Sequence, residues 1–259
     1  MGGTQNSELR TQNSELRTQN SELRDTLTPM VSPIVDVRGA VKTFRKGANE
    51  IHALRGVDLV MEAGEVVLVV GPSGGGKSTL LNLIGGLDRP DAGNVQVAGV
   101  DVAASSQRSL DAFRRRHLGF VFQFFNLIGS LTARDNVALA LAARGVHPWA
   151  TARDRASALL ADLGLGARAE HRPSELSGGE QQRVAIARAI AGEPDVILAD
   201  EPTGNIDTAA TAGVMAMLDD LNDRLGVTLL VVTHDASLAA HADRVLEMVD
   251  GRLSPHVPR

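Results

Sequence analysis

The stretch GPSGGGKS at residues 71–78 constrains the fold of this 259-residue chain more than any other feature. It follows the apolar run VVLVV and precedes the helical pattern TLLNLIGGL. Glycines that turn a buried strand into a helix leave backbone N–H groups and the positive end of a helix dipole open to an anion. We therefore expect a phosphate site in which Lys77 reaches the β- and γ-phosphate oxygens and Ser78 places its hydroxyl on Mg²⁺. The residues predicted to bind the phosphates are Gly71, Ser73, Gly74, Gly75, Gly76, Lys77, Ser78 and Thr79.

Apolar residues along the rest of the chain predict an α/β fold. Continuous apolar runs at 66–70, 196–199 and 228–232 are typical of parallel strands that are covered on both faces. A helix is expected at 208–225, where apolar residues recur every three or four positions. Its predicted buried face consists of Val214, Met217, Leu218, Leu221 and Leu225. The alternation of strand and helix indicates a parallel sheet packed between helices.

Two further segments differ from this pattern. Half-buried runs at 34–37 and 57–61 predict strands of a small antiparallel sheet before the phosphate site. Residues 132–164 carry two helical patterns rich in Ala and Leu, which indicate an inserted helical subdomain. The predicted domains are an N-terminal tail at 1–32, a core at 33–123 and 179–253, a helical subdomain at 124–178, and a C-terminal tail at 254–259.

The N-terminal tail contains three perfect copies of TQNSELR at residues 4–24. A period of seven raises the possibility of a coiled coil, but each copy supplies one apolar residue where a coiled-coil seam needs two. Three heptapeptides are also too short to form a solenoid. We therefore expect a disordered or loosely helical tail outside the fold.

Composition excludes several classes of protein. The hydrophobic content of 43% supports a globular core, and no apolar run is long enough to cross a bilayer or to resemble a secretory signal. The absence of cysteine excludes disulfides and fits a reducing compartment, so we expect a cytoplasmic chain. A net charge of −5 with mixed charges gives no basic footprint, which argues against a nucleic-acid binder without excluding one, and no nucleic-acid partner is expected.

Two acids end the apolar run at 196–199. Asp200 and Glu201 stand at the end of a predicted buried strand, where charged groups are costly unless they have a function. We expect Asp200 to hold the Mg²⁺ shell and Glu201 to accept the proton of an attacking water. The alternative is a pair of solvated acids at a strand end.

The sequence LSGGEQQR at 176–183 opens a further predicted helix. Ser177 and Glu180 form a capping box, while Gly178 and Gly179 leave the backbone open to an anion. The residues alone allow two interpretations equally, a well-capped helix and an anion site.

Five motifs in this order resemble the ATPase subunit of ABC transporters. They are the stretches at 71–78, 176–183 and 196–201, together with Gln123 and the histidine of VVTHD, and the match covers about residues 34–253. The stretches FVFQFFNLIGSLTARDNV and DEPTGNID look like the MacB/LolD-like group, which contains ATPases of macrolide exporters and lipoprotein-release systems, with FtsE nearby. The resemblance implies a P-loop NTPase core of the RecA-like type, with an antiparallel β subdomain and an α-helical insert, that binds ATP and Mg²⁺ and hydrolyses ATP.

The resemblance also implies roles for single residues. Gln123 would contact Mg²⁺ and the attacking water, and His234 would contact the γ-phosphate. Phe44 stands where the family usually has a tyrosine that stacks on adenine, and it keeps the ring face. Asp207 corresponds to a loop aspartate that contacts the opposite subunit, and it can equally be a helix N-cap. The predicted catalytic residues are Glu201, His234, Gln123 and Lys77, and the predicted metal ligands are Ser78, Gln123 and Asp200.

Two partners follow from the resemblance. The first is a second ATPase subunit, arranged head to tail so that each ATP lies between one P-loop and the partner's Ser177, Gly178 and Gly179. The second is an integral membrane permease at the cytoplasmic face of the membrane. Phe124 and Phe125 follow Gln123 where the chain leaves the sheet, and we expect them to form the docking surface for that permease. Phe120 and Phe122 are interpreted as strand side chains packed in the core.

The alternative function is a non-transport ABC ATPase that acts on DNA or ribosomes. Such proteins usually carry two ATPase domains, a long coiled-coil insert or zinc-binding cysteines. This chain has one ATPase unit, only about 50 residues between Gln123 and the motif at 176–183, and no cysteine. The sequence therefore favours a transport ATPase subunit.

Overall fold

The computed structural model of the chain describes residues 32–47 and 49–257. The TQNSELR repeats and the tail predicted at 1–32, apart from its last residue, lie outside the described residues, as do the last two residues of the chain. The part of the chain from Pro33 onward forms one unit.

A six-stranded sheet forms the centre of this unit, in the order β10-β9-β3-β8-β7-β6. Its strands are β3 (Val66–Val70), β6 (Leu118–Phe122), β7 (Val196–Asp200), β8 (Thr228–Thr233), β9 (Arg244–Val249) and β10 (Arg252–Pro255). All pair in parallel except β10, which joins β9 antiparallel at the edge. The three predicted parallel strands are confirmed, and β6 and β9 extend the sheet on either side of them.

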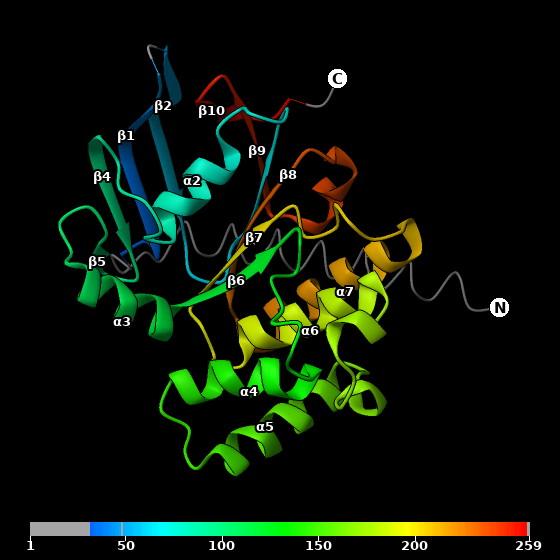
Figure 1. Ribbon diagram of the computed structural model, residues 1–259. Coiled ribbons are helices and arrows are strands. Elements are labelled where there is room, and N and C mark those ends of the chain that lie inside the picture. Colours follow the sequence, from blue (N-terminus) through cyan, green and yellow to red (C-terminus); the bar gives the residue numbers. More distant parts are fainter. Residues whose placement is uncertain (1–31, 48, 258–259) are drawn as a thin grey trace, which may run out of the picture. The chain divides into compact units, whose positions relative to one another are not determined.

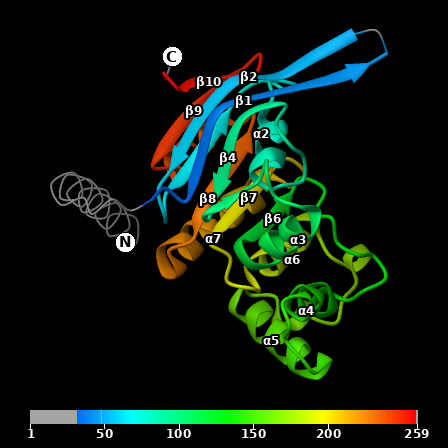
Figure 2. The ribbon, with the colours of Figure 1, turned by 90° about the vertical axis from the view of Figure 1, so that its left-hand side faces the viewer.

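A second, four-stranded sheet is antiparallel and has the order β2-β1-β4-β5. Its strands are β1 (Val35–Lys46), β2 (Asn49–Met61), β4 (Ala92–Val97) and β5 (Val100–Asp101). The prediction of an antiparallel sheet before the phosphate motif is confirmed, although β1 and β2 are much longer than the apolar runs that predicted them. Figure 2 shows the hairpin of β1 and β2 projecting past the other strands.

Six α-helices complete the described fold. They are α2 (Lys77–Ile84), α3 (Gln107–His117), α4 (Ala133–Ala143), α5 (Trp149–Asp162), α6 (Gly178–Ile190) and α7 (Thr208–Leu225). Short 3₁₀ helices occupy Gly166–Arg168, Pro173–Glu175 and Ala236–His241. Helices α4 and α5 lie together at the end of the unit remote from the antiparallel sheet (Figure 1). They occupy the segment expected to form a helical subdomain, and the exact borders of that subdomain stay a prediction.

Helix α7 has the predicted bounds, but one member of its predicted buried face is wrong. Leu225 is 54% exposed because it is the last helical residue, whereas Val214, Leu218 and Leu221 are buried. Met215 is buried instead, on the flank of the predicted stripe. The spacing located the helix correctly, but Met217 of the predicted face is only half-buried.

The central sheet is buried on both faces, as the continuous apolar runs predict. Along β3, Val66, Leu68 and Val70 join a core cluster with residues of α4 to α7, while Val67 and Val69 join a second cluster with the antiparallel sheet, α2 and α3. The alternating strand geometry produces this division, since successive side chains point to opposite faces.

The expectation that Phe120 and Phe122 are core residues is only partly correct. Their rings stack with centroids 5.6 Å apart. Phe120 packs against the second core cluster, but both side chains are only half-buried. The reason is their position on β6, the last strand of the sheet, whose outer edge no strand of the described residues covers.

The phosphate-motif loop is wedged between the two sheets. Gly76 has φ +108°, and a Cβ atom there would overlap the carbonyl oxygen of Ala53 in β2. Gly71 meets the carbonyl of Met248 in β9 in the same way. Gly74 also has a positive φ of +80°, yet no atom of the described residues lies within 4 Å of its Cβ position.

This difference predicts the effect of alanine at two neighbouring glycines. Gly74→Ala should lower the free energy of unfolding by about 1–2 kcal/mol, the cost of left-handed backbone in an L-residue. Gly76→Ala should lower it further, because the added carbon must also displace the backbone of β2. Urea denaturation of both variants without nucleotide measures this, and equal losses would contradict the close packing of Gly76 against Ala53.

Candidate active site

Four parallel strands end level at one edge of the central sheet. Val70, the last residue of β3, pairs with Thr233 of β8. Asp200, the last residue of β7, pairs with Phe122 of β6. The segments that follow these strands therefore enter the same space, the crevice outside the carboxyl ends of an open α/β sheet where ligands bind.

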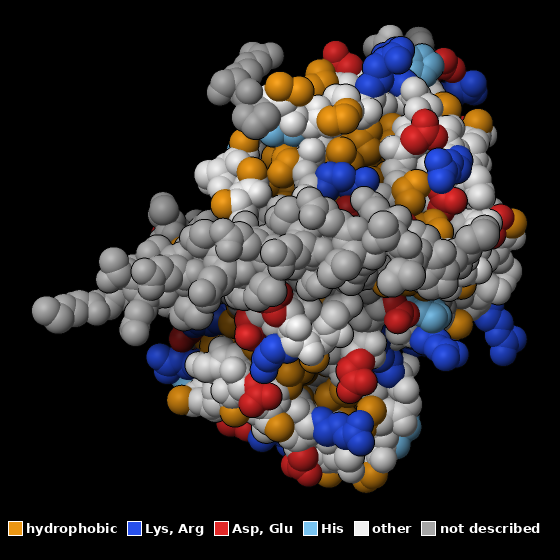
Figure 3. Space-filling view, turned by 180° about the vertical axis from the view of Figure 1, so that it is seen from behind, with side chains coloured by type: hydrophobic (Ala, Val, Ile, Leu, Met, Phe, Trp, Pro, Cys, Tyr) orange, Lys and Arg blue, Asp and Glu red, His pale blue; other side chains and the backbone are white. Residues whose placement is uncertain are grey.

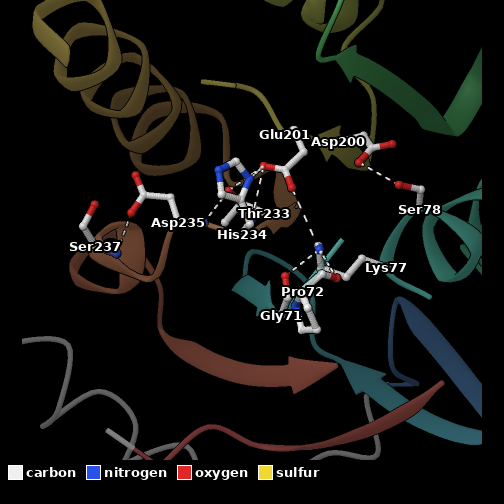
Figure 4. Close-up of polar contacts among 10 residues, drawn as sticks. All are labelled: Gly71, Pro72, Lys77, Ser78, Asp200, Glu201, Thr233, His234, Asp235 and Ser237. Carbon is white, nitrogen blue, oxygen red and sulfur yellow. Dashed lines mark hydrogen bonds and ion pairs between the residues drawn. The ribbon is translucent and has the colours of Figure 1, made fainter. Parts of the chain in front are cut away.

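Lys77 occupies the middle of this space. Its Nζ donates hydrogen bonds to the carbonyl oxygens of Gly71 (2.7 Å) and Pro72 (3.0 Å) and lies 3.9 Å from Oε1 of Glu201. Figure 4 shows the ammonium group between the loop and the carboxylate. Lys77 is only 6% exposed, and a buried charge is costly without polar partners. The three oxygens supply those partners and hold the ammonium group in place.

Ser78 and Asp200 meet beside it. The Ser78 hydroxyl donates to Oδ1 of Asp200 at 3.0 Å (Figure 4). Burial raises the pKa of the Asp200 carboxyl above its ordinary value, and the charge of Glu201 adds to the rise. The hydrogen bond from Ser78 and the charge of Lys77 oppose it. A cation at this point would favour the ionised carboxylate.

Glu201 turns back across the strand ends. Its backbone is left-handed, with φ +46°, which is uncommon outside glycine and costs free energy. Its Oε2 accepts hydrogen bonds from the Thr233 hydroxyl (2.8 Å) and the backbone N–H of His234 (3.2 Å), and lies 2.9 Å from Nδ1 of His234. The carboxylate is thus fixed by β8, and Oε1 remains turned towards Lys77 (Figure 4).

Gln123 reaches the same space from the end of β6. Its side chain lies against Gly204, where an added Cβ would come within 3.0 Å of Nε2. The backbone carbonyl oxygen of Gln123 accepts a hydrogen bond from the Asn205 side chain at 2.8 Å. The loop after Gln123 and the loop after Glu201 are therefore joined.

These groups surround a cavity of about 570 Å³. Of the predicted site residues, it is lined by Ser73, Gly74, Gly76, Lys77, Ser78, Thr79, Gln123, Asp200 and Glu201. His234 is in contact with Glu201 without lining the cavity, and Gly71 and Gly75 lie in the loop beneath it. Phe44, Ser177, Gly178, Gly179 and Asp207 are not among the lining residues.

Sequence reasoning missed one wall of the cavity. It is formed by Glu50, Ile51, His52, Ala53 and Arg55 of β2 and by Asp250 and Gly251 of the turn between β9 and β10. Backbone hydrogen bonds from Gly251 to Gly75 and from Arg55 to Gly251 tie this wall to the phosphate loop. No local pattern marks these residues, because only the packing of the two sheets brings them to the site.

Phe44 lies next to this wall. It pairs with Ile51 across the hairpin, and its ring is 42% exposed. The ammonium group of Lys42 lies 5.3 Å from the ring centroid, within the range of a cation–π contact. The stacking role of Phe44 therefore stays a prediction.

The capping box of α6 is confirmed. The Ser177 hydroxyl accepts the N–H of Glu180, and the Glu180 carboxylate accepts the N–H of Ser177 at 2.8 Å. This backbone hydrogen bond, followed by that from the Arg168 side chain, lowers the pKa of Glu180 to about 2. The N-cap role of Asp207 is confirmed as well, since its carboxylate accepts the N–H of Ala210 at 2.8 Å.

The lowered pKa of Glu180 predicts a pH-dependent contribution to stability. Because the folded-state pKa lies below the ordinary value of 4.5, the charge stabilises the fold above pH 4.5, and this stability is lost as the pH falls towards 2. The thermal unfolding midpoint of the parent should therefore lie above that of Glu180→Gln at neutral pH. The difference between the two midpoints should disappear as the pH falls towards 2. Thermal unfolding across this range measures it, and a gap that stays constant would show that the Glu180 charge is not its cause.

Known proteins are similar to this chain in sequence. Residues 54–204 match the ABC transporter family. The lipoprotein-releasing system ATP-binding protein LolD of Chromohalobacter salexigens is 48% identical over 216 residues, which cover 83% of this chain and 91% of the relative. The macrolide export ATP-binding/permease protein MacB of Rhodopirellula baltica is 46% identical over 225 residues, covering 86% of this chain and 33% of that larger protein.

A solved structure agrees with these relatives. The dimeric ATP-binding cassette MJ0796, in a post-hydrolysis state bound to ADP and Pi, is similar with a TM-score of 0.80 and 41% sequence identity. The similarity covers 87% of this chain and all of that one.

Proposed function

The chain belongs to the ABC transporter family, and from this we propose that it is the subunit which hydrolyses ATP to drive a separate membrane permease. As a member of this family it is an ATP-binding and ATP-hydrolysing enzyme. The observation that carries the proposal is the convergence of the phosphate loop, Gln123, Asp200 and Glu201 on one cavity. Similarity to LolD and MacB supports a place in their group.

In this proposal the phosphate loop holds the nucleotide. The bare backbone of the glycines and the N-terminus of α2 face the phosphates, and Lys77 exchanges its two carbonyl partners for phosphate oxygens. Phe44 supplies a ring face for the base beside the β2 wall. The residues of β2 and of the turn between β9 and β10 that form this wall would then surround the nucleoside.

The proposed metal is Mg²⁺, and the residues present fit it. Ser78 and Asp200 offer a hydroxyl and a carboxylate, and Gln123 adds an amide oxygen, which are the hard oxygen ligands that Mg²⁺ takes. No group of three His, Cys, Asp or Glu side chains able to hold a metal occurs in the described part of the chain. Phosphate oxygens would complete the coordination of the ion, which would neutralise developing charge when bound.

Glu201 is the proposed general base. Two hydrogen-bond donors and the His234 ring hold one of its oxygens, so the other is positioned to accept the proton of a water at the γ-phosphate. His234, linked to Glu201 through Nδ1, would contact the γ-phosphate and orient that water. The side chain of His234 is 62% exposed, which leaves it accessible to a nucleotide.

A second subunit would complete the site. Ser177 caps α6, and Gly178 and Gly179 form its first turn. None of the three lines the cavity of its own chain, and in this proposal they meet the ATP of the partner. Asp207 would contact the opposite phosphate loop in addition to capping α7. The similar cassette MJ0796 is a dimer in its ADP- and Pi-bound state, which supports this arrangement.

A groove beside β6 is the proposed docking site of the permease. It encloses about 390 Å³ and has an apolar floor that includes Leu87, Phe120, Phe122 and Ala140. Four arginines also line it, Arg114, Arg115, Arg144 and Arg188, and no Asp or Glu is among its described lining residues. Its charge therefore suits a cytoplasmic segment of the permease that carries apolar and acidic side chains.

The predicted docking pair lies near this groove without lining it. Phe124 is 73% exposed, whereas Phe125 is half-buried, and a Cβ on Gly178 would lie 3.8 Å from its ring. Phe124 thus remains the better candidate for direct contact with the permease. Phe125 packs beside the start of α6, so its part in docking would be indirect.

No helix in the described ranges is long and apolar enough to cross a membrane. We propose that the permease holds this chain at the cytoplasmic face of the membrane. On the face seen in Figure 3 acidic and basic side chains are interspersed over the described part of the chain. The relatives LolD and MacB give no support to the alternative of an ATPase acting on DNA or ribosomes.

Removal of the proposed base tests the mechanism. Glu201→Gln should lower ATP turnover about 10²- to 10⁴-fold, corresponding to roughly 3–5 kcal/mol, because the amide cannot accept the proton. ATP binding, measured by titration calorimetry, should persist. Glu62→Gln, an exposed carboxylate beyond the far end of β2, serves as the control. Near-parental turnover by Glu201→Gln would refute its role as base.

Removal of the exposed aromatic tests the docking site. Phe124→Ser should weaken capture of the permease about tenfold or more, because burial of a phenylalanine contributes roughly 1.5–3 kcal/mol. The measurement is recovery of a multi-spanning membrane protein that co-purifies with the tagged chain from detergent extracts. Val257→Ser, with 74% exposure at the C-terminal end, is the matched control. Equal recovery of the membrane protein with both variants would show that Phe124 is not part of the docking site.

A further inference from the structure

The loop after Gln123 has a strained backbone. Phe125 and Asn126 both adopt left-handed conformations, with φ +60° and +51°, although neither is glycine. Such residues persist where surrounding contacts hold them in place. Within the loop, the Phe125 N–H donates to Phe122 and the Asn126 N–H donates to Phe124. These two hydrogen bonds use the carbonyl oxygens of Phe122 and Phe124 and leave those of Phe125 and Asn126 to other donors.

Arg188 of α6 holds both carbonyls. One guanidinium nitrogen donates to the oxygen of Phe125 at 2.8 Å, and the other donates to that of Asn126. The planar fork of arginine suits two neighbouring acceptors, and lysine offers no such geometry. The strained loop is therefore fastened to the helix that begins after Ser177.

The charge of Arg188 has no acidic partner among the described ion pairs. Burial lowers the pKa of its guanidinium, and no carboxylate in the described part of the chain opposes that effect. The two carbonyls are thus its anchors, and hydrogen bonds to a charged group are worth about twice those between neutral groups.

The same side chain lines the docking groove. Arg188 and Asn126 stand together in the wall of the groove, next to Phe122. A group that enters the groove therefore meets the guanidinium and one of its two anchored residues directly. Two residues before Phe125, the chain carries Gln123, whose side chain lines the nucleotide cavity.

We propose that Arg188 is a positioning residue that transmits occupation of the groove to Gln123. With the groove free, Arg188 keeps the loop fixed against α6 and Gln123 in place at the nucleotide cavity. A carboxylate of the partner competes with the two carbonyls for the guanidinium, and its arrival releases or shifts the loop. The inference rests on the proposed roles of Gln123 and of the groove, but the clamp itself is a property of the chain alone.

A probe on the loop tests the clamp directly. The chain has no cysteine, so Phe124→Cys allows a single nitroxide to be attached beside Gln123. In this labelled background Arg188→Met should increase nitroxide mobility in the electron paramagnetic resonance spectrum. Arg188→Lys keeps the charge and should restore order only in part, and it replaces the methionine variant if that variant does not fold.

The matched control is Arg89→Met. Arg89 also donates through two guanidinium nitrogens to two backbone carbonyls, those of Ala103 and Ser105, and it lines neither the groove nor the nucleotide cavity. Those carbonyls lie outside the Gln123 loop, so Arg89→Met should leave the nitroxide spectrum unchanged. Equal mobility in the parent and Arg188→Met, or equal loosening by Arg89→Met, would overturn the proposal.

A second readout, in the chain without the label, connects the clamp to the reaction. Arg188→Met should lower kcat about tenfold and raise the Mg²⁺ concentration at half-maximal rate, with little change in KM for ATP. Arg89→Met should change neither. If the parent itself does not hydrolyse ATP, the proposed function fails while the nitroxide result still decides the clamp. Loosening of the loop with unchanged kcat and Mg²⁺ dependence would overturn the link to Gln123.

Discussion

Four parallel strands end level at one edge of the central sheet, and this shared end places the polar groups of the nucleotide site. Strands β3, β8, β7 and β6 are held in register because alternate side chains pack into two different cores, one on each face of the sheet. A slip of one residue would exchange the faces of a strand and bury the wrong set of side chains. Hydrophobic packing thus fixes, to within one residue, which polar groups emerge at the shared edge.

Polar contacts at that edge then set the orientation of each group. Lys77 is buried with three oxygens as partners, and Glu201 is turned by a left-handed backbone towards donors on β8. Buried charges are stable only when paired, so each of these groups limits the positions open to the other. A phosphate bound at this point would replace the two carbonyl partners of Lys77. A water molecule would then lie between the phosphate and Glu201.

The inserted helices add a second level of organisation. Helix α6 carries a capped N-terminus at Ser177 and, three turns later, the Arg188 side chain that holds the loop after Gln123. The same arginine lines a groove free of carboxylates among its described residues. One rigid element therefore connects a surface suited to a second subunit, a surface suited to a membrane partner, and the nucleotide cavity.

The sequence by itself determined the α/β class, the phosphate loop, the strand-end acids and the caps of α6 and α7, because each depends on residues adjacent in the chain. It misjudged Leu225, whose spacing fits a buried face although the helix ends there. Only the tertiary structure decided that β2 and the turn at Gly251 form a wall of the cavity, and that Arg188 holds the loop after Gln123. Those contacts join residues far apart in sequence, and their partners are backbone carbonyls, which look alike in every sequence and leave no local pattern.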